Sequence, residues 1–149
     1  MKFLGIDYGT KRIGFAVSDD GGRLAFPLEV IKNNGEIMGK LEALIVKEKI
    51  KEIVVGESLD FAGLPNILQK EVYFFITKLK NNRKFKIPVH QEKEFLTSIE
   101  ARRYGDFENV RSSEAYSRRK NKKSTSVDAS AAALILQRYL DKFNKSLLA

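Results

Sequence analysis

The sequence contains no cysteine and no long hydrophobic run. Without cysteine the chain can form no disulfide, carries no thiolate nucleophile and offers no Cys-ligated zinc site. No apolar run approaches the roughly 18 residues that indicate a membrane span, and no charged and then apolar leader precedes the first strand-like segment. We therefore expect a protein without a membrane partner and, by default, in the cytoplasm.

Two common phosphate-binding motifs are also absent. Neither G-x-x-x-x-G-K-[ST] nor G-x-G-x-x-G occurs, so the glycines that P-loop and Rossmann proteins need are missing. The one histidine, His90, belongs to no Ser-His-Asp arrangement that the sequence reveals. We expect His90 near the end of a strand, with a backbone partner.

Positive charge is present in excess. The 27 lysines and arginines outnumber the 19 aspartates and glutamates, which gives a formal net charge of +8. Such a charge favours a polyanionic partner, most commonly nucleic acid, although a basic surface kept for solubility is the alternative. The densest basic segment comprises Arg111, Arg118, Arg119, Lys120, Lys122 and Lys123, opposed only by Glu114. We expect it to be a loop that clamps a phosphate backbone.

The length of 149 residues and the hydrophobic fraction of 43% predict one globular domain, residues 1–149. Short strand-like segments at 2–7, about 12–18 and about 23–31 are separated by turns, which predicts an antiparallel meander. Further strands are expected at 53–56 and 87–90, and helices at 35–50, 66–79, 98–104 and 126–143. This order predicts an α/β protein with a mixed sheet and helices on both faces. In the last helix we expect Ala131, Leu134, Ile135 and Tyr139 to pack against the sheet.

Three carboxylates lie where the expected strands and helices end or begin. Asp7 ends the first strand, Glu94 follows the fifth, and Asp128 opens the last helix. Taken singly, they are explained by a turn, a solvated charge and a helix dipole. If the three converge at one end of the sheet, their repulsion requires a cation. Mg²⁺ would balance them and would activate water for the hydrolysis of a phosphodiester.

Three segments resemble the motifs of one family. IDYGTKRIGFAVSD at residues 6–19 resembles the N-terminal signature of the YqgF (RuvX) family. EFLTS at 94–98 resembles part of its D-E-R-L-T-T-x-E-A motif, and VDASAAALILQRYL at 127–140 resembles its C-terminal motif. The motifs occur in the same order as in the family and extend over most of the chain.

The resemblance implies an RNase H-like fold, whose five-stranded mixed sheet has three antiparallel and then two parallel strands flanked by helices. It implies that Asp7, Glu94 and Asp128 are the catalytic residues and metal ligands, with Mg²⁺ or Mn²⁺ as cofactor. The implied substrate is structured RNA, pre-16S rRNA near its 5′ end during ribosome biogenesis. We expect Lys11 and Arg12, within the first motif, to steady a neighbouring phosphate.

The sequence departs from the family pattern beside Glu94. The preceding acid is Lys93 here, and the following arginine is Phe95. Because Lys93 adds positive charge next to a proposed ligand, we regard Glu92 as the fallback ligand, since it lies on the same side of an extended chain.

Other functions stay open at this point. The same fold can serve a resolvase of Holliday junctions or other branched DNA, or a non-catalytic RNA-binding factor of ribosome assembly. D-x-G-T also occurs in the phosphate-binding hairpin of actin/Hsp70-type ATPases, but these need two such domains, which 149 residues cannot build. The sequence leaves a monomer and a homodimer equally open.

Overall fold

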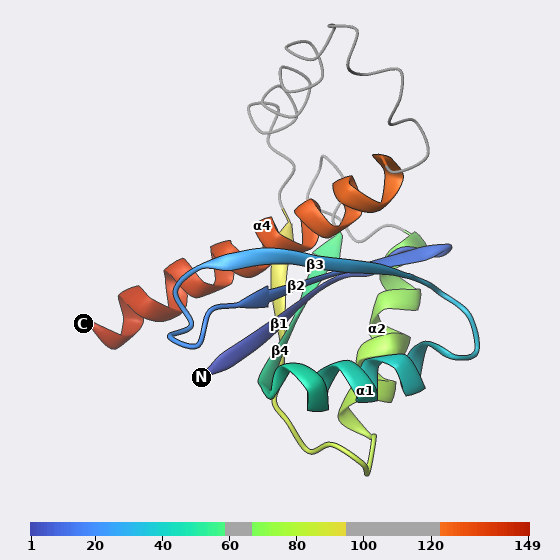
Figure 1. Cartoon of the computed structure of the whole chain (residues 1–149), viewed down its shortest axis with the longest axis horizontal. Helices are drawn as coiled ribbons and strands as arrows, with labels where there is room; N and C mark the ends of the chain where they lie inside the picture. The colour runs from blue at the N-terminus through green and yellow to red at the C-terminus, as the bar shows by residue number, and fades with distance from the viewer. Residues whose placement is uncertain (59–66, 95–122) are drawn as a thin grey trace, which may run out of the picture.

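The computed structural model describes residues 1–58, 67–94 and 123–149, which form one mixed sheet with helices on both faces (Figure 1). The strands are β1 Lys2–Asp7, β2 Arg12–Ser18, β3 Ala25–Lys32, β4 Ile50–Ser58 and β5 Val89–Glu94. Their order in the sheet is β3-β2-β1-β4-β5; β1, β2 and β3 are antiparallel neighbours, and β4 and β5 run parallel to β1. The predicted sheet is therefore confirmed, with β1 at its centre.

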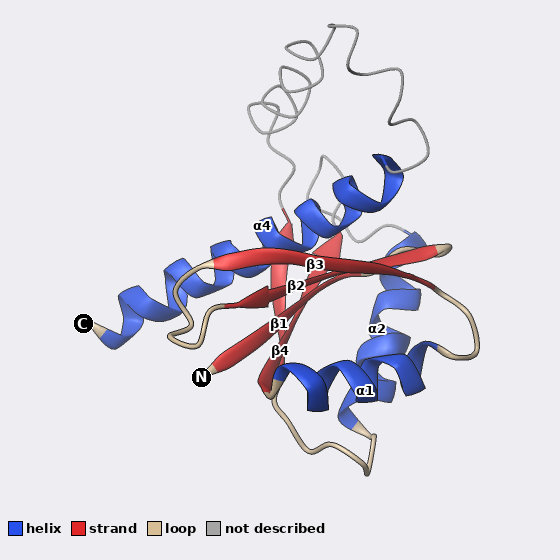
Figure 2. Cartoon of the chain, in the orientation of Figure 1, coloured by secondary structure: helices blue, strands red, loops and turns tan. Residues whose placement is uncertain are grey.

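Within the described residues, helices α1 (Ile37–Glu48), α2 (Ile67–Lys80) and α4 (Lys123–Leu147) cover this sheet (Figure 2). None of the helices in the described part of the chain is long and apolar enough to cross a membrane. The helix expected at 98–104 and most of the basic segment, residues 111–122, lie outside the described residues.

Some element bounds differ from those expected. We predicted a strand at 87–90 from its apolar residues, but β5 begins at Val89 and continues through polar residues to Glu94. The pairing with β4 explains this difference, because the parallel pairing of the two strands continues as far as Ser58 opposite Glu94. The main-chain hydrogen bonds of such a pair do not require apolar side chains. The last helix begins at Lys123 rather than 126, which places Asp128 in its second turn instead of at its start.

Side chains of β1 alternate between two hydrophobic cores. Leu4 and Ile6 pack towards α1 and α2, whereas Phe3 packs with residues of α4. Because successive residues of a strand point to opposite faces, Gly5 and Asp7 share the α4 face with Phe3.

The face of α4 on the sheet is rotated from the one predicted. Leu134 is 45% exposed, so its predicted packing is wrong, while Ala132, Leu136 and Leu140 are buried. Ile135 is buried and Tyr139 partly buried, as expected, whereas Ala131 is only partly buried. Leu134 and Ile135 are adjacent, and adjacent residues of a helix do not face the same neighbour.

The predicted hairpin between β2 and β3 is present. Asp19 Oδ1 accepts hydrogen bonds from the backbone N–H groups of Arg23 at 2.7 Å and Leu24 at 3.1 Å. These donors favour the charged carboxylate and hold the pKa of Asp19 below its usual value. The side chain of Gln137 bonds Ala25 N and Arg23 O, both at 2.9 Å, and so anchors α4 to this hairpin.

Candidate active site

Asp7 is the last residue of the central strand. It pairs with Gly14 of antiparallel β2 and lies one residue beyond the pairing of Ile6 with Val55 of parallel β4. The sheet therefore changes from antiparallel to parallel at Asp7, the position at which open α/β sheets form their sites. Its side chain is partly buried. The predicted position of Asp7 in a central strand is thus confirmed.

The turn after Asp7 requires a glycine. A Cβ added at Gly9 would lie 2.3 Å from the carbonyl oxygen of Arg12, closer than any real contact. The turn is also tied to the end of β3, because Asn33 donates from Nδ2 to Gly9 O at 2.8 Å and from N to Lys11 O at 2.9 Å. The end of β1 is therefore held in one geometry, which suits a residue that must present a ligand.

Helix α4 crosses β1 in the opposite direction. The ring of Phe3 contacts Tyr139 and Phe143, with centroids 5.9 and 5.4 Å apart. Two residues further along β1, a Cβ on Gly5 would lie 2.9 Å from the carbonyl oxygen of Ala132. Residues nearer the end of β1 thus contact residues nearer the start of α4.

The same progression places Asp128 near the end of β1. Asp7 is the next residue of β1 on the α4 face, and Asp128 lies one helical turn before Ala132. The backbone positions of two predicted ligands, far apart in sequence, therefore lie at the same end of the sheet. The side chain of Asp128 is outside the described part of the structure, so its orientation stays a prediction.

Glu94 occupies the corresponding end of β5. It pairs with Ser58 at the end of β4, and β4 is the only strand between β5 and β1. Two strand spacings separate β1 from β5 by about 10 Å. Its backbone is thus at the end expected for a ligand, and the side chain of Glu94 is again outside the described set.

The fallback ligand Glu92 already has a partner. It is only 4% exposed and forms an ion pair with Lys142 of α4. A buried carboxylate needs such a cation, and here the helix supplies it. The interpretation of Glu92 as an alternative metal ligand therefore has no support in this structure, and the residue instead fastens α4 to β5.

The positive charge of Lys93 does not lie on the face of β5 that carries Glu92 and Glu94, contrary to the concern raised by the sequence. It is exposed and lies between Glu92 and Glu94, so strand alternation puts it on the opposite face of β5. The replacement of the family's acid by Lys93 therefore adds its charge away from the α4 face. Phe95, the second departure, is not among the described residues.

His90 is part of a polar cluster that the sequence did not reveal. Its Nε2 lies 2.6 Å from Glu52 Oε2, and its ring stacks on Tyr139 with centroids 5.1 Å apart. The expected backbone partner is thus wrong, because a neighbouring carboxylate takes that place. Burial, followed by the charges of Glu52 and Glu92, raises the pKa of Tyr139. No sequence signal marked this cluster, because every residue of β5 after Val89 is polar and no alternation marks the face that is buried.

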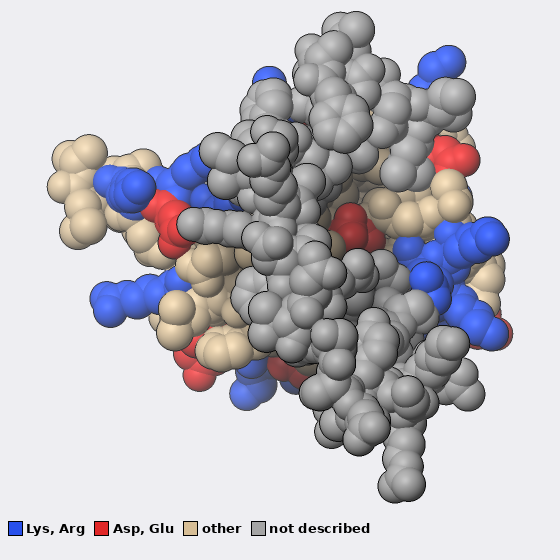
Figure 3. Space-filling view, turned by 90° about the horizontal axis from the view of Figure 1, so that it is seen from above, with Lys and Arg blue, Asp and Glu red and all other residues tan. Residues whose placement is uncertain are grey.

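Seen from above, a small recessed patch of acidic atoms is visible near the centre of the molecule, with lysine and arginine side chains towards both sides (Figure 3). Of the predicted phosphate-binding residues, Lys11 and Arg12 are exposed beside Asp7, and Lys123 begins α4. Among the side chains that the structure describes, no three of the metal-ligating types come together. That set does not include Glu94 and Asp128, two of the three predicted ligands.

Comparisons with known proteins agree with this architecture. The family described as "RuvX: Holliday junction resolvase" matches residues 1–142. A protein of Lawsonia intracellularis is 39% identical over 95% of this chain and 94% of its own length, and one of Sulfurihydrogenibium is 35% identical over 97% and 93%. Both carry the provisional name of pre-16S rRNA nuclease.

One solved structure has the same fold. The Holliday junction resolvase of fowlpox virus superposes with a TM-score of 0.52 over 95% of this chain and 99% of its own length. The identity of 16% is too low to carry more than the fold.

Proposed function

Because this chain belongs to the RuvX family, we propose that it is a metal-dependent nuclease that processes the 5′ end of pre-16S rRNA in the cytoplasm during ribosome biogenesis. The observation that carries this proposal is the crossing of α4 over β1, which brings the positions of Asp7 and Asp128 to one end of the sheet. The names of the relatives support the RNA substrate.

The proposed ligands are Asp7, Glu94 and Asp128. All three are carboxylates, without histidine or cysteine, and such an oxygen-only set suits Mg²⁺ or Mn²⁺ rather than zinc or copper. When bound, the cation would supply a water of lowered pKa and positive charge for the phosphate oxygens. Asp7, at the end of the central strand, would fix the position of the site. Lys11, exposed in the adjoining turn, and Arg12, exposed at the start of β2, would orient the substrate through its phosphates.

The test compares substrates and metals in one experiment. Purified protein is incubated with a pre-16S rRNA fragment that retains its 5′ extension, a four-way DNA junction and plain RNA and DNA duplexes. Each reaction contains Mg²⁺, Mn²⁺ or EDTA. We expect cleavage of the rRNA fragment only, in the presence of either metal. Cleavage of the junction alone would favour the second candidate, a branched-DNA resolvase, which the description of the family supports. Binding without cleavage would favour a non-catalytic assembly factor.

A further prediction concerns the basic segment. Replacement of Arg118, Arg119, Lys120 and Lys122 by alanine should weaken the binding of every RNA tested, with little dependence on sequence. The slope of log affinity against log salt should become shallower by about 0.7–0.9 for each lost phosphate contact. Fluorescence anisotropy at several salt concentrations measures this slope. The matched control replaces Lys40, Lys47, Lys51 and Lys80, which are outside the proposed interface, and an equal change there would contradict a specific role for the segment.

A further inference from the structure

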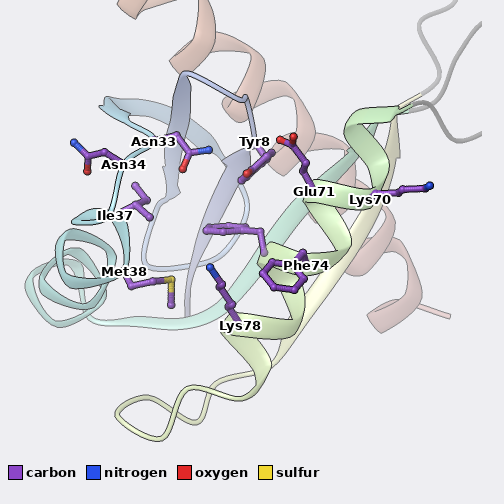
Figure 4. A pocket seen from close by; sticks show the side chains of 11 residues that line it. Tyr8, Asn33, Asn34, Ile37, Met38, Lys70, Glu71, Phe74 and Lys78 are labelled. Atoms are coloured by element: carbon purple, nitrogen blue, oxygen red, sulfur yellow. The ribbon is translucent and has the colours of Figure 1, made fainter.

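A second feature adjoins Asp7 on the other face of the sheet. The turn after β1, the connection from β3 to α1 and one side of α2 enclose an open groove of about 540 Å³ (Figure 4). Its lining includes Tyr8, Asn33, Met38, Glu71, Phe74 and Lys78. The proposed triad does not use these residues, because α4 and Asp7 lie on the opposite face.

The groove presents an aromatic ring to solvent. Phe74 is 67% exposed, although the next residue of α2, Phe75, is buried. Lys78 follows Phe74 by one helical turn, and its ammonium lies 5.0 Å from the ring centroid. An exposed ring next to a cation is the combination with which proteins hold unpaired nucleotides, because the base stacks and the phosphate meets the charge.

The rest of the groove is preformed. Tyr8 packs on Phe75 with ring centroids 5.0 Å apart, which supports the wall below the strand end. The hydrogen bonds of Asn33 to Gly9 O and Lys11 O hold the opposite wall to the same turn. A ligand would therefore meet a fixed shape and would need little ordering of the protein.

Charges within the groove give it a direction. Lys78 reaches in between Met38 and Phe74, whereas Glu71 lies beside Tyr8 at the other end (Figure 4). Lys70, the third charged residue of the lining, points away from the cavity. A nucleotide satisfies both ends, since its phosphate can meet the ammonium and a ribose hydroxyl or base amine can donate to the carboxylate. An apolar partner would instead have to desolvate both charges without compensation.

We propose that this groove binds an unpaired nucleotide of the RNA that the active site cleaves, with its base on Phe74 and its phosphate on Lys78. The proposal rests on the nuclease function proposed above and adds a second contact to it. Tyr8 directly follows Asp7 in the chain, and an RNA strand that leaves the groove past Lys11 and Arg12 would reach the acidic end of β1. The groove would thus recognise single-stranded RNA next to the cleaved bond.

The test measures binding without cleavage. A fluorescent single-stranded oligouridylate is titrated with protein in EDTA, and anisotropy gives the affinity. Phe74→Ala should weaken binding at least about fivefold, the lower limit for loss of one stacked base. Phe74→Tyr should retain binding. Phe26→Ala is the matched control, because Phe26 is 49% exposed on β3 and does not line the groove.

Lys78→Ala should make the salt slope shallower by about 0.7, as expected for one phosphate contact on a single strand. Binding of an RNA duplex should change little in Phe74→Ala, since the bases of a duplex are already stacked on one another. Unchanged oligouridylate affinity in Phe74→Ala would overturn the proposed role of the groove. The same holds if the only effect of Phe74→Ala is to convert a homodimer into a monomer. Melting curves verify that each variant is folded.

The two proposals can fail separately. If wild-type protein cleaves pre-16S rRNA but Phe74→Ala binds oligouridylate normally, the groove is wrong and the nuclease stands. If no substrate is cleaved with Mg²⁺ or Mn²⁺ while Phe74→Ala still loses affinity, the groove stands as part of an RNA-binding factor.

Discussion

Asp7→Asn is expected to lower the rate of Mg²⁺-dependent RNA cleavage by at least about a hundredfold. This corresponds to a loss of about 2.7 kcal/mol of transition-state stabilisation, the size of effect observed when one oriented electrostatic group is removed. Asparagine keeps the shape of the side chain but removes the negative charge that a divalent cation requires. Single-turnover cleavage of the pre-16S rRNA fragment measures the effect.

The matched control is Asp20→Asn, which makes the same chemical change at a side chain that is 96% exposed in the β2–β3 hairpin. It should cleave at the wild-type rate. Asp7→Asn should also bind RNA and melt almost as wild type does, because the change is made at a strand end and leaves both hydrophobic cores intact. Equal rates in wild type and Asp7→Asn would remove Asp7 from the mechanism.

The central strand and Asp7 could be predicted because their signals are local. An apolar run that ends in Asp, a tight turn with glycine and a second apolar run specify β1 and β2 without information from the rest of the chain. Strand β3 and the order of the meander follow from the same alternation of apolar runs and short turns. The positions of β4 and β5 beside β1 were expected from the family resemblance, and the polar sequence of β5 hid most of its length.

The face of α4 could not be predicted so well, because the choice depends on how closely the helix approaches the sheet. The sequence offers both Leu134 and Ile135 as large apolar residues near the middle of the helix. The atoms that meet Gly5 are Leu136 Cβ and the backbone oxygen of Ala132, and this close contact sets the helix rotation that buries Ile135 and exposes Leu134. A close approach at a single glycine leaves no periodic signal in the sequence.

The groove on the other face was missed for a similar reason. Phe74 lies within the apolar stretch VYFFI of α2, and so continuous a run does not show which of its side chains face solvent. Only the packing of the helix shows that Phe75 is buried and that Phe74 faces solvent. Likewise, the contact of His90 with Glu52 and the ion pair of Glu92 with Lys142 join residues about forty to fifty positions apart, and no local spacing predicts them.

Gly5→Ala is expected to destabilise the fold by about 1–3 kcal/mol, the range for an extra methyl group in a well-packed interior. The new Cβ would lie 2.8 Å from Leu136 Cβ and 2.9 Å from the carbonyl oxygen of Ala132, and neither atom can move unless the whole helix moves. Urea unfolding measures the change in the free energy of unfolding.

Two other glycines provide graded controls. At Gly56 the nearest atom to an added Cβ is Ile135 Cδ1 at 2.6 Å, the end of a flexible side chain, so Gly56→Ala should cost less than Gly5→Ala. At Gly39 in α1 nothing lies within 4 Å, and Gly39→Ala should stabilise the protein, by about 0.5–1 kcal/mol, because alanine favours the helix.

Gly5→Ala also tests the geometry of the proposed active site. The crossing at Gly5 is what directs the start of α4, and with it Asp128, towards the end of β1. If α4 is displaced there, cleavage should fall even at temperatures at which the variant is fully folded, whereas Gly56→Ala should cleave more nearly as wild type does. A Gly5→Ala protein with full stability and full activity would mean that α4 does not approach β1 as closely as described. The convergence of Asp7 and Asp128 would then lose its structural basis.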